Sequence, residues 1–226
     1  MDIPFAFILI QYLCLLFSLC VHEAAHAKTA EVCGDPSARL LGRVSLNPAV
    51  HADPVGTVLM PIIMLTFGFP FLFGWAKPVP FNPVNLKNIR RDPVLIAIAG
   101  PLSNVALAVG TVILLKIAVL VTGGFEAHGG PIPDNVAMVA TYLILINLVL
   151  FTFNLIPVPP LDGHYVLGYF LPPKGEEVLQ QIGPFGIIIA IVLARPVLGT
   201  LIPIFLTPFV LFLPELGLGL ELIWRR

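Results

Sequence analysis

Two histidines and a glutamate follow the pattern H-E-x-x-H at residues 22–26. On a helix, His22 and His26 lie one turn apart on the same face, so both imidazoles can reach one zinc ion at about 2.0–2.1 Å. Glu23 lies beside the first of these ligands, where it can act on water activated by the metal rather than bind the metal. The pattern predicts a hydrolytic metal site.

The pattern stands at the end of an uncharged run, residues 3–21. The whole chain is 58% hydrophobic and only 11% charged, whereas soluble domains carry about 25% charged residues. This composition predicts an all-α polytopic membrane protein with one membrane-embedded domain, residues 1–226. The formal net charge of −1 gives no nucleic-acid-binding surface.

A membrane core of about 30 Å needs about 20 helical residues. We expect about five transmembrane helices, at residues 4–32, 93–121, 135–161, 178–194 and 196–214. The last two would form a hairpin that turns at Arg195-Pro196. The chain would then divide into a catalytic core, residues 1–171, and a C-terminal helical hairpin, residues 172–226.

The uncharged segment 54–76 is also long enough to span. A basic loop follows it, and a full crossing would put that loop outside, against the positive-inside rule. The segment contains four helix-interrupting residues, Pro61, Gly68, Pro70 and Gly74. We therefore favour a re-entrant segment over a sixth spanning one. A short β-strand is possible at residues 43–46, in the loop after the first helix.

Charge also predicts the orientation. Lys28, Arg39 and Arg43 follow the first apolar run, and only Asp2 precedes it. The positive-inside rule makes the end near Lys28 cytoplasmic, so the metal site lies towards that side. We expect a multi-pass protein of a prokaryotic plasma membrane.

A third ligand is predicted in the segment N-L-I-P-V-P-P-L-D-G at residues 154–163. Its prolines would break the helix before Asp162 and can re-aim that carboxylate. Since this segment and the first helix both descend towards the cytoplasm, Asp162 can meet His22 and His26 at a similar depth. Two histidines and one carboxylate leave a fourth zinc position for water.

The motifs at 22–26 and 154–163, with A-G-P-L-S-N at 99–104 and G-W-A-K-P-V-P at 74–80, resemble the site-2 protease family of intramembrane zinc metalloproteases, peptidase family M50. The resemblance covers roughly residues 15–170. It implies one zinc ion per chain held by His22, His26 and Asp162, with Glu23 as the general base.

The resemblance further implies that Asn154 helps to hold the substrate backbone or the oxyanion. Substrates would be single-span membrane proteins cut by regulated intramembrane proteolysis, with the lipid bilayer as surroundings. His164 stands where the family often has a second glycine. No PDZ or CBS-type domain fits within this length, so we expect a short form; a homo-oligomer or a regulatory membrane partner stays open.

Several polar residues have a simpler interpretation as structural groups. Asn154 can bond a carbonyl freed near Pro157, and Asn104 is expected to pack or hydrogen-bond between helices. Loop or turn roles are expected for three further residues, His51, Asp53 and His164. The cysteines, Cys14, Cys20 and Cys33, lack C-x-x-C spacing; buried apolar roles are expected for Cys14 and Cys20.

Two other functions use the same residue types. A membrane metal transporter would place ligands along a path through the bilayer, whereas the predicted outer loop offers only Glu126, His128 and Asp134. A non-catalytic substrate-binding scaffold is the second alternative, and the intact Glu23 argues against it.

Overall fold

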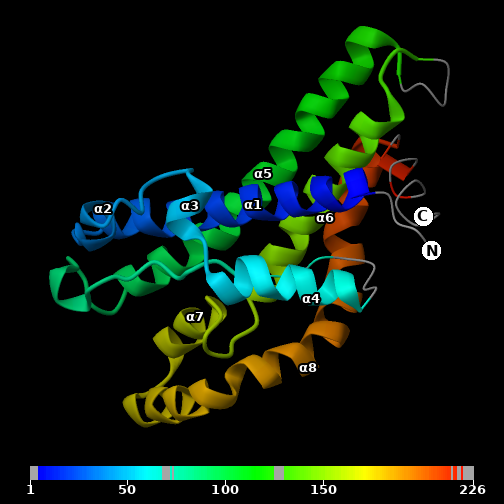
Figure 1. Ribbon diagram of the computed structural model, residues 1–226. Helices are drawn as coiled ribbons and strands as arrows, with labels where there is room; N and C mark the ends of the chain where they lie inside the picture. The colour runs from blue at the N-terminus through cyan, green and yellow to red at the C-terminus, as the bar shows by residue number, and fades with distance from the viewer. Residues whose placement is uncertain are drawn as a thin grey trace.

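The computed structural model describes residues 5–67, 72, 74–124, 130–214, 216–217 and 220, and within these residues every regular element is helical (Figure 1). The long helices are α1 (Phe5–Val32), α5 (Asp92–Thr122), α6 (Asp134–Asn154) and α8 (Pro173–Phe212). Shorter elements are α2 (Ser37–Leu40), α3 (Pro48–His51), η1 (Pro54–Leu59), α4 (Met60–Thr66), η2 (Pro83–Asn85) and α7 (Gly163–Phe170). The all-α prediction is confirmed. The strand considered at residues 43–46 is wrong, because these residues form bends and coil.

Among the described residues, four helices are long and apolar enough to cross a membrane. The spanning segments are Phe7–Val32, Asp92–Thr122, Asp134–Asn154 and Phe185–Phe212. Their outward side chains are largely exposed, for example Leu120 at 72% and Leu211 at 76%. A continuous apolar exterior of this kind is typical of a protein surrounded by lipid.

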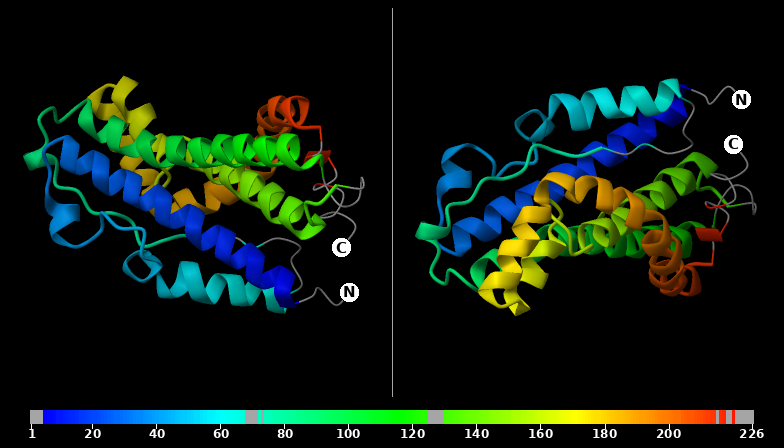
Figure 2. Two further views of the ribbon diagram at one scale, coloured as in Figure 1. Left: turned by 90° about the horizontal axis from the view of Figure 1, so that it is seen from above. Right: turned by 90° about the horizontal axis from the view of Figure 1, so that it is seen from below.

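Helix α1 packs against both α5 and α6 (Figure 2). Ser18 of α1 accepts a hydrogen bond from Asn147 of α6, and His22, one turn further along α1, lies beside Asp162, which follows α6, so the two segments advance in the same direction. This is the parallel descent that the sequence predicts for the helices carrying His22 and Asp162.

The segment after α3 enters and returns at the same end of the molecule. Its helical part, Pro54–Thr66, is too short to cross a membrane, and residues 74–80 come back without helix beside it. The N–H of Lys77 donates to the carbonyl of His51 at 2.8 Å, which joins the two ends of the segment. The two ends of the segment therefore lie side by side, as the favoured re-entrant interpretation requires; Gly68 and Pro70 lie outside the described residues.

Two glycines let the limbs of this segment touch. A Cβ on Gly56 would lie 2.4 Å from the carbonyl oxygen of Trp75, and one on Gly74 would lie 2.4 Å from the carbonyl oxygen of Gly56. Real Cβ atoms do not approach so closely, so this packing requires glycine at both positions.

The prediction of a C-terminal helical hairpin is wrong. Arg195 and Pro196 lie inside α8, which continues through them as one bent helix (Figure 1). In a lipid-exposed helix the backbone has no other way to satisfy its hydrogen bonds, so proline bends the helix instead of ending it. One helix replaces two, which reduces the expected five spans to four.

The helix expected over residues 135–161 ends earlier, at Asn154. Turns that include Pro157, Pro159 and Pro160 follow, and they lead to Asp162 at the start of α7. Prolines lack the N–H that would continue the helical ladder, so the predicted break is confirmed.

Candidate metal centre and active site

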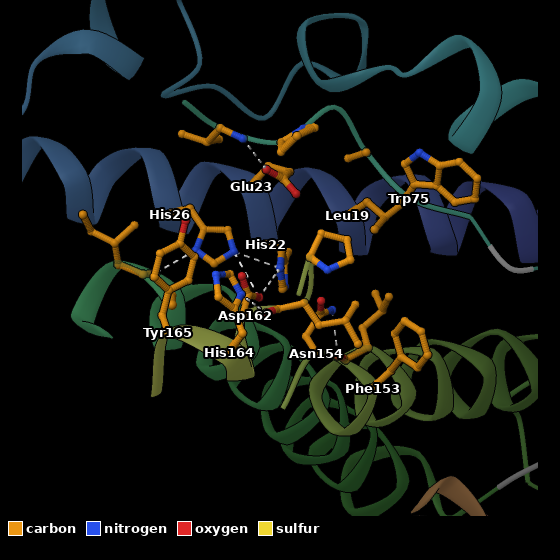
Figure 3. A pocket seen from close by; sticks show the side chains of 18 of the residues that line it. Leu19, His22, Glu23, His26, Trp75, Phe153, Asn154, Asp162, His164 and Tyr165 are labelled. Carbon is orange, nitrogen blue, oxygen red and sulfur yellow. Dashed lines mark hydrogen bonds and ion pairs between the residues drawn. The ribbon is translucent and has the colours of Figure 1, made fainter. Parts of the chain in front are cut away.

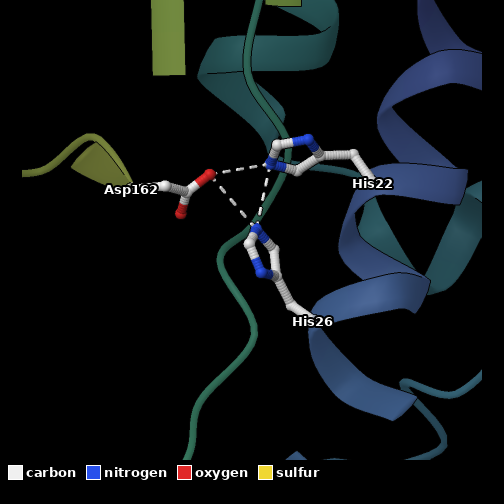
Figure 4. A group of neighbouring side chains, drawn as sticks. All are labelled: His22, His26 and Asp162. Carbon is white, nitrogen blue, oxygen red and sulfur yellow. Dashed lines mark hydrogen bonds and ion pairs between the residues drawn. The ribbon is translucent and has the colours of Figure 1, made fainter. Parts of the chain in front are cut away.

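Three ligand atoms from two distant parts of the chain converge on one point (Figure 4). The Nε2 atoms of His22 and His26 lie 3.0 Å apart, and Asp162 Oδ2 lies 3.2 Å from the first and 3.4 Å from the second. Ligands at zinc-binding distance in a tetrahedron are separated by about 3.3 Å. The triangle therefore has the size that a zinc ion requires.

The hydrogen bonds behind the histidines support the same assignment. His22 Nδ1 lies 2.6 Å from the side-chain oxygen of Asn104, and His26 Nδ1 lies 2.7 Å from the carbonyl of Ile96. Both partners accept, so each Nδ1 carries the hydrogen and each Nε2 turns a lone pair to the centre. Because both Nε2 atoms face it with lone pairs, the buried Asp162 Oδ2 receives no hydrogen bond from any residue that the structure describes. Three converging lone-pair donors fit a cation, and their chemistry fits zinc.

Helix α5 passes directly against the two histidines at Gly100. A Cβ at this position would lie 2.3 Å from His26 Nε2 and 2.7 Å from Cε1 of His22. The missing side chain of Gly100 therefore makes room for the ligand pair.

Glu23 lies on a different side of α1 from the ligand pair but lines the same cavity (Figure 3). Its Oε2 accepts a hydrogen bond of 3.1 Å from the N–H of Val79. Since Pro78 and Pro80 have no N–H, Val79 supplies the one amide donor of this three-residue stretch. The stretch returning from the re-entrant segment thus holds the glutamate.

The cavity has a volume of about 620 Å³ and lies between α1, the stretch 74–81, α6 and the turns before α7. Its lining includes the metal-binding group, Glu23 and many apolar side chains, among them Leu19, Trp75, Val79, Leu150, Phe153, Pro159 and Ile187. The size and the mostly apolar lining with a few polar groups are typical of a ligand-binding site.

Asn154 and His164 both line this cavity. Asn154 Nδ2 donates to the carbonyl of Leu150 at 3.0 Å, one turn back in α6, rather than to a carbonyl near Pro157 as the simpler interpretation expected. His164 Nδ1 donates to the carbonyl of Leu161 at 2.6 Å, and its ring lies 3.9 Å from that of Tyr165. Burial, together with the carboxylate of Asp162, raises the pKa of the Tyr165 hydroxyl.

The remaining polar candidates lie away from the ligands. Asp53 caps η1 by accepting from the N–H groups of Val55 and Gly56, as expected for a turn residue. His51 is buried, with Nε2 2.7 Å from the carbonyl of Ser45. Glu126 and His128 lie outside the described residues.

Asn104 hydrogen-bonds between helices as the sequence predicts, but two contacts of the site were not predicted: that His22 is the partner of Asn104, and that Val79 contacts Glu23. The first had a signal, since Asn104 follows Gly100 by four residues and shares its helix face. The second is a contact between a side chain and a backbone amide 56 residues away, which no spacing rule predicts.

Four helices able to cross a membrane thus surround a His-His-Asp group whose chemistry fits zinc, an arrangement consistent with a zinc metalloprotease. Residues 10–193 match the family model described as Peptidase family M50, and the chain belongs to this family. It is 38% identical over 193 residues to the putative zinc metalloprotease YwhC of Bacillus subtilis (strain 168), covering 82% of this chain and 80% of that relative.

It is also similar to a second group of bacterial relatives, each named putative zinc metalloprotease Rip2. Identity is 33% over 178 residues to Rip2 of Mycobacterium tuberculosis (strain H37Rv) and 27% to that of Mycolicibacterium smegmatis. In both cases the match covers 79% of this chain but 63% of the relative. No solved structure matched the chain.

Proposed function

We propose that this protein is a zinc-dependent endopeptidase that hydrolyses peptide bonds of membrane-spanning substrates within the bilayer. One zinc ion per chain would be held by His22, His26 and Asp162. The observation that carries the proposal is the meeting of these three ligand atoms in a cavity that Glu23 also lines, between helices long enough to cross a membrane.

When bound, zinc supplies Lewis-acid activation of the attacking water and of the scissile carbonyl. Glu23 accepts the proton of that water and passes it to the nitrogen of the leaving amine. Because Val79 holds Oε2, we assign the proton transfer to Oε1. The water's oxygen joins the carbonyl carbon, and the carbon–nitrogen bond breaks.

Asn154 would position the substrate from the cavity wall. One N–H of its amide is bonded to Leu150, so Oδ1 and the second N–H remain for the substrate backbone. The substrate must be locally unwound, because a helix hides its carbonyls in its own hydrogen bonds. Single-span membrane proteins are therefore the proposed substrates.

The orientation follows from charge. Lys28, Arg39, Arg43, Lys87 and Arg91 all lie near the end of α1 and the start of α5. The positive-inside rule places that end in the cytoplasm, so the active site opens towards the cytoplasmic side. The bacterial relatives support a prokaryotic plasma membrane.

The test compares the purified full chain in detergent with Glu23→Gln, measuring zinc content and cleavage of a single-span membrane substrate. We expect about one zinc per chain in both proteins and a loss of cleavage of at least about a hundredfold in the variant. Chelation should abolish cleavage by the wild type, and added zinc should restore it.

His26→Ala is the matched second variant, since it should lose zinc and cleavage together. Cleavage retained in zinc-loaded Glu23→Gln would overturn the catalytic role of Glu23. Wild type that binds zinc without cutting would favour the scaffold, and zinc transport into proteoliposomes without cutting would favour the transporter.

A further inference from the structure

Three polar side chains fill the interior behind His22, between α1, α5 and α6. Ser18, Asn104 and Asn147 are each 0% exposed, and the proposed mechanism uses none of them. Burying amides among apolar helices is unfavourable unless their hydrogen bonds are made. This amide network therefore needs an explanation beyond packing.

The network runs from α6 to the metal ligand in short steps. Asn147 Nδ2 donates to the carbonyl of Leu143 at 2.8 Å and to the hydroxyl of Ser18 at 2.9 Å. Asn104 Nδ2 donates to Asn147 Oδ1 at 2.7 Å, and Asn104 Oδ1 lies 2.6 Å from His22 Nδ1.

The direction of every step is set at the far end. The Leu143 carbonyl can only accept, so Asn147 must turn Nδ2 towards it and Oδ1 towards Asn104. Asn104 must therefore donate from Nδ2 to that oxygen, so its own Oδ1 faces His22. An amide oxygen only accepts, so Nδ1 of His22 carries the hydrogen.

His22 depends on this network more than His26 does. The partner of His26 Nδ1 is a backbone carbonyl, that of Ile96, which cannot exchange acceptor for donor. The partner of His22 is a side-chain amide, which can turn over and present N–H instead. With Asn147 removed, the remaining hold on Asn104 is a bond of 3.4 Å to the carbonyl of Ser18.

We propose that Asn147 is a positioning residue for the metal centre, acting through Asn104 to keep the hydrogen of His22 on Nδ1 and the lone pair of Nε2 towards the metal. The inference rests on the proposed zinc site. If the Asn104 amide turns over, His22 Nε2 takes the hydrogen and cannot bind zinc. Loss of such outer partners weakens metal affinity by about 10- to 100-fold.

The experiment measures zinc affinity by competition with a chelator on the full chain in detergent, with thermal unfolding of the same samples. Asn147→Leu and Asn147→Ala remove the acceptor that Asn104 needs and should weaken zinc binding by about 10- to 100-fold. Asn147→Asp keeps an oxygen facing Asn104 and should bind zinc within about threefold of the wild type, even where its Tm falls.

Thr152→Val is the matched control, because Thr152 is buried on the same helix and its hydroxyl has no hydrogen-bond partner among the described residues. Its zinc affinity should equal that of the wild type. Zinc affinity that follows Tm across all variants, or that is unchanged in Asn147→Ala, would overturn the proposal. If the wild-type protein binds no zinc, the proposed function is wrong, and the inference about Asn147 fails with it.

Discussion

At the scale of single residues, the site depends on what is missing as much as on what is present. Gly100 has no side chain where α5 meets the histidines, and Pro78 and Pro80 have no N–H beside Glu23. The missing side chain of Gly100 leaves room for the rings of His22 and His26, and the missing N–H groups of the two prolines leave Val79 as the amide donor to Glu23. Two substitutions test this.

Gly100→Ala should abolish zinc binding, because the added methyl would overlap the His26 ring, whose Nε2 would lie 2.3 Å away. We expect zinc content to fall at least about tenfold, with cleavage lost in proportion. The control is Gly110→Ala on the same helix, where a Cβ would meet no atom of the described residues within 4 Å. Normal zinc content in Gly100→Ala would show that the histidines do not lie where the structure has them.

Val79→Pro should remove the hydrogen bond to Glu23 Oε2 while keeping an extended backbone, since Val79 already lies between two prolines. Hydrogen bonds to charged groups contribute about 1.5–3 kcal/mol, so we expect kcat to fall about 10- to 100-fold with zinc content unchanged. Val79→Ala keeps the N–H and should cleave like the wild type. Equal kcat in the two variants would argue against the contact.

At the scale of elements, the end of α1 is fixed to the loop that leads back from the re-entrant segment. Asp35 accepts hydrogen bonds from the hydroxyl of Ser37, the amide of Asn85 and the N–H of Asn82. Burial raises the pKa of the Asp35 carboxyl, but these hydrogen bonds outweigh it and hold the pKa below its ordinary value.

Asp35→Asn should therefore destabilise the protein at neutral pH by about 1–3 kcal/mol, since buried donors lose their charged partner. A folded pKa below the unfolded value gives stability that is present above about pH 4 and is lost as the pH falls through the folded pKa. The gap between wild type and variant should shrink on acidification. Thermal unfolding of both proteins from pH 7 to pH 3 measures it, and a constant gap would contradict the assignment.

At the scale of the whole molecule, one bent α8 in place of a hairpin changes where the chain ends up. Leu213 and Leu216 pack with Val119 at the far end of α5, away from the basic loops. A hairpin would have returned the chain to the cytoplasmic side; Arg225 and Arg226 lie outside the described residues.

Alkaline phosphatase fused after Gly217 should therefore be active, because that enzyme works only when it is exported. The same reporter fused after Gly42, in the basic loop that follows α1, should be inactive. Reporter activity in intact cells measures both fusions. An inactive reporter at Gly217 would indicate that this part of the chain lies in the cytoplasm, which would favour the hairpin.

The sequence by itself determined the helical class, and it singled out His22, His26 and Asp162 on two segments that run in the same direction, which the structure brings together. Helical spacing, apolar composition and proline breaks are local properties, so His22, His26, Asp162 and a helix break before Asp162 could be predicted without a structure, whereas the helix end at Asn154 came from the structure. Only the tertiary structure decided that α8 is one helix, that Val79 holds Glu23 and that Asn147 reaches His22 through Asn104. These depend on how distant segments pack, and packing can overrule a local signal such as Arg195-Pro196 or create a contact that no local signal encodes.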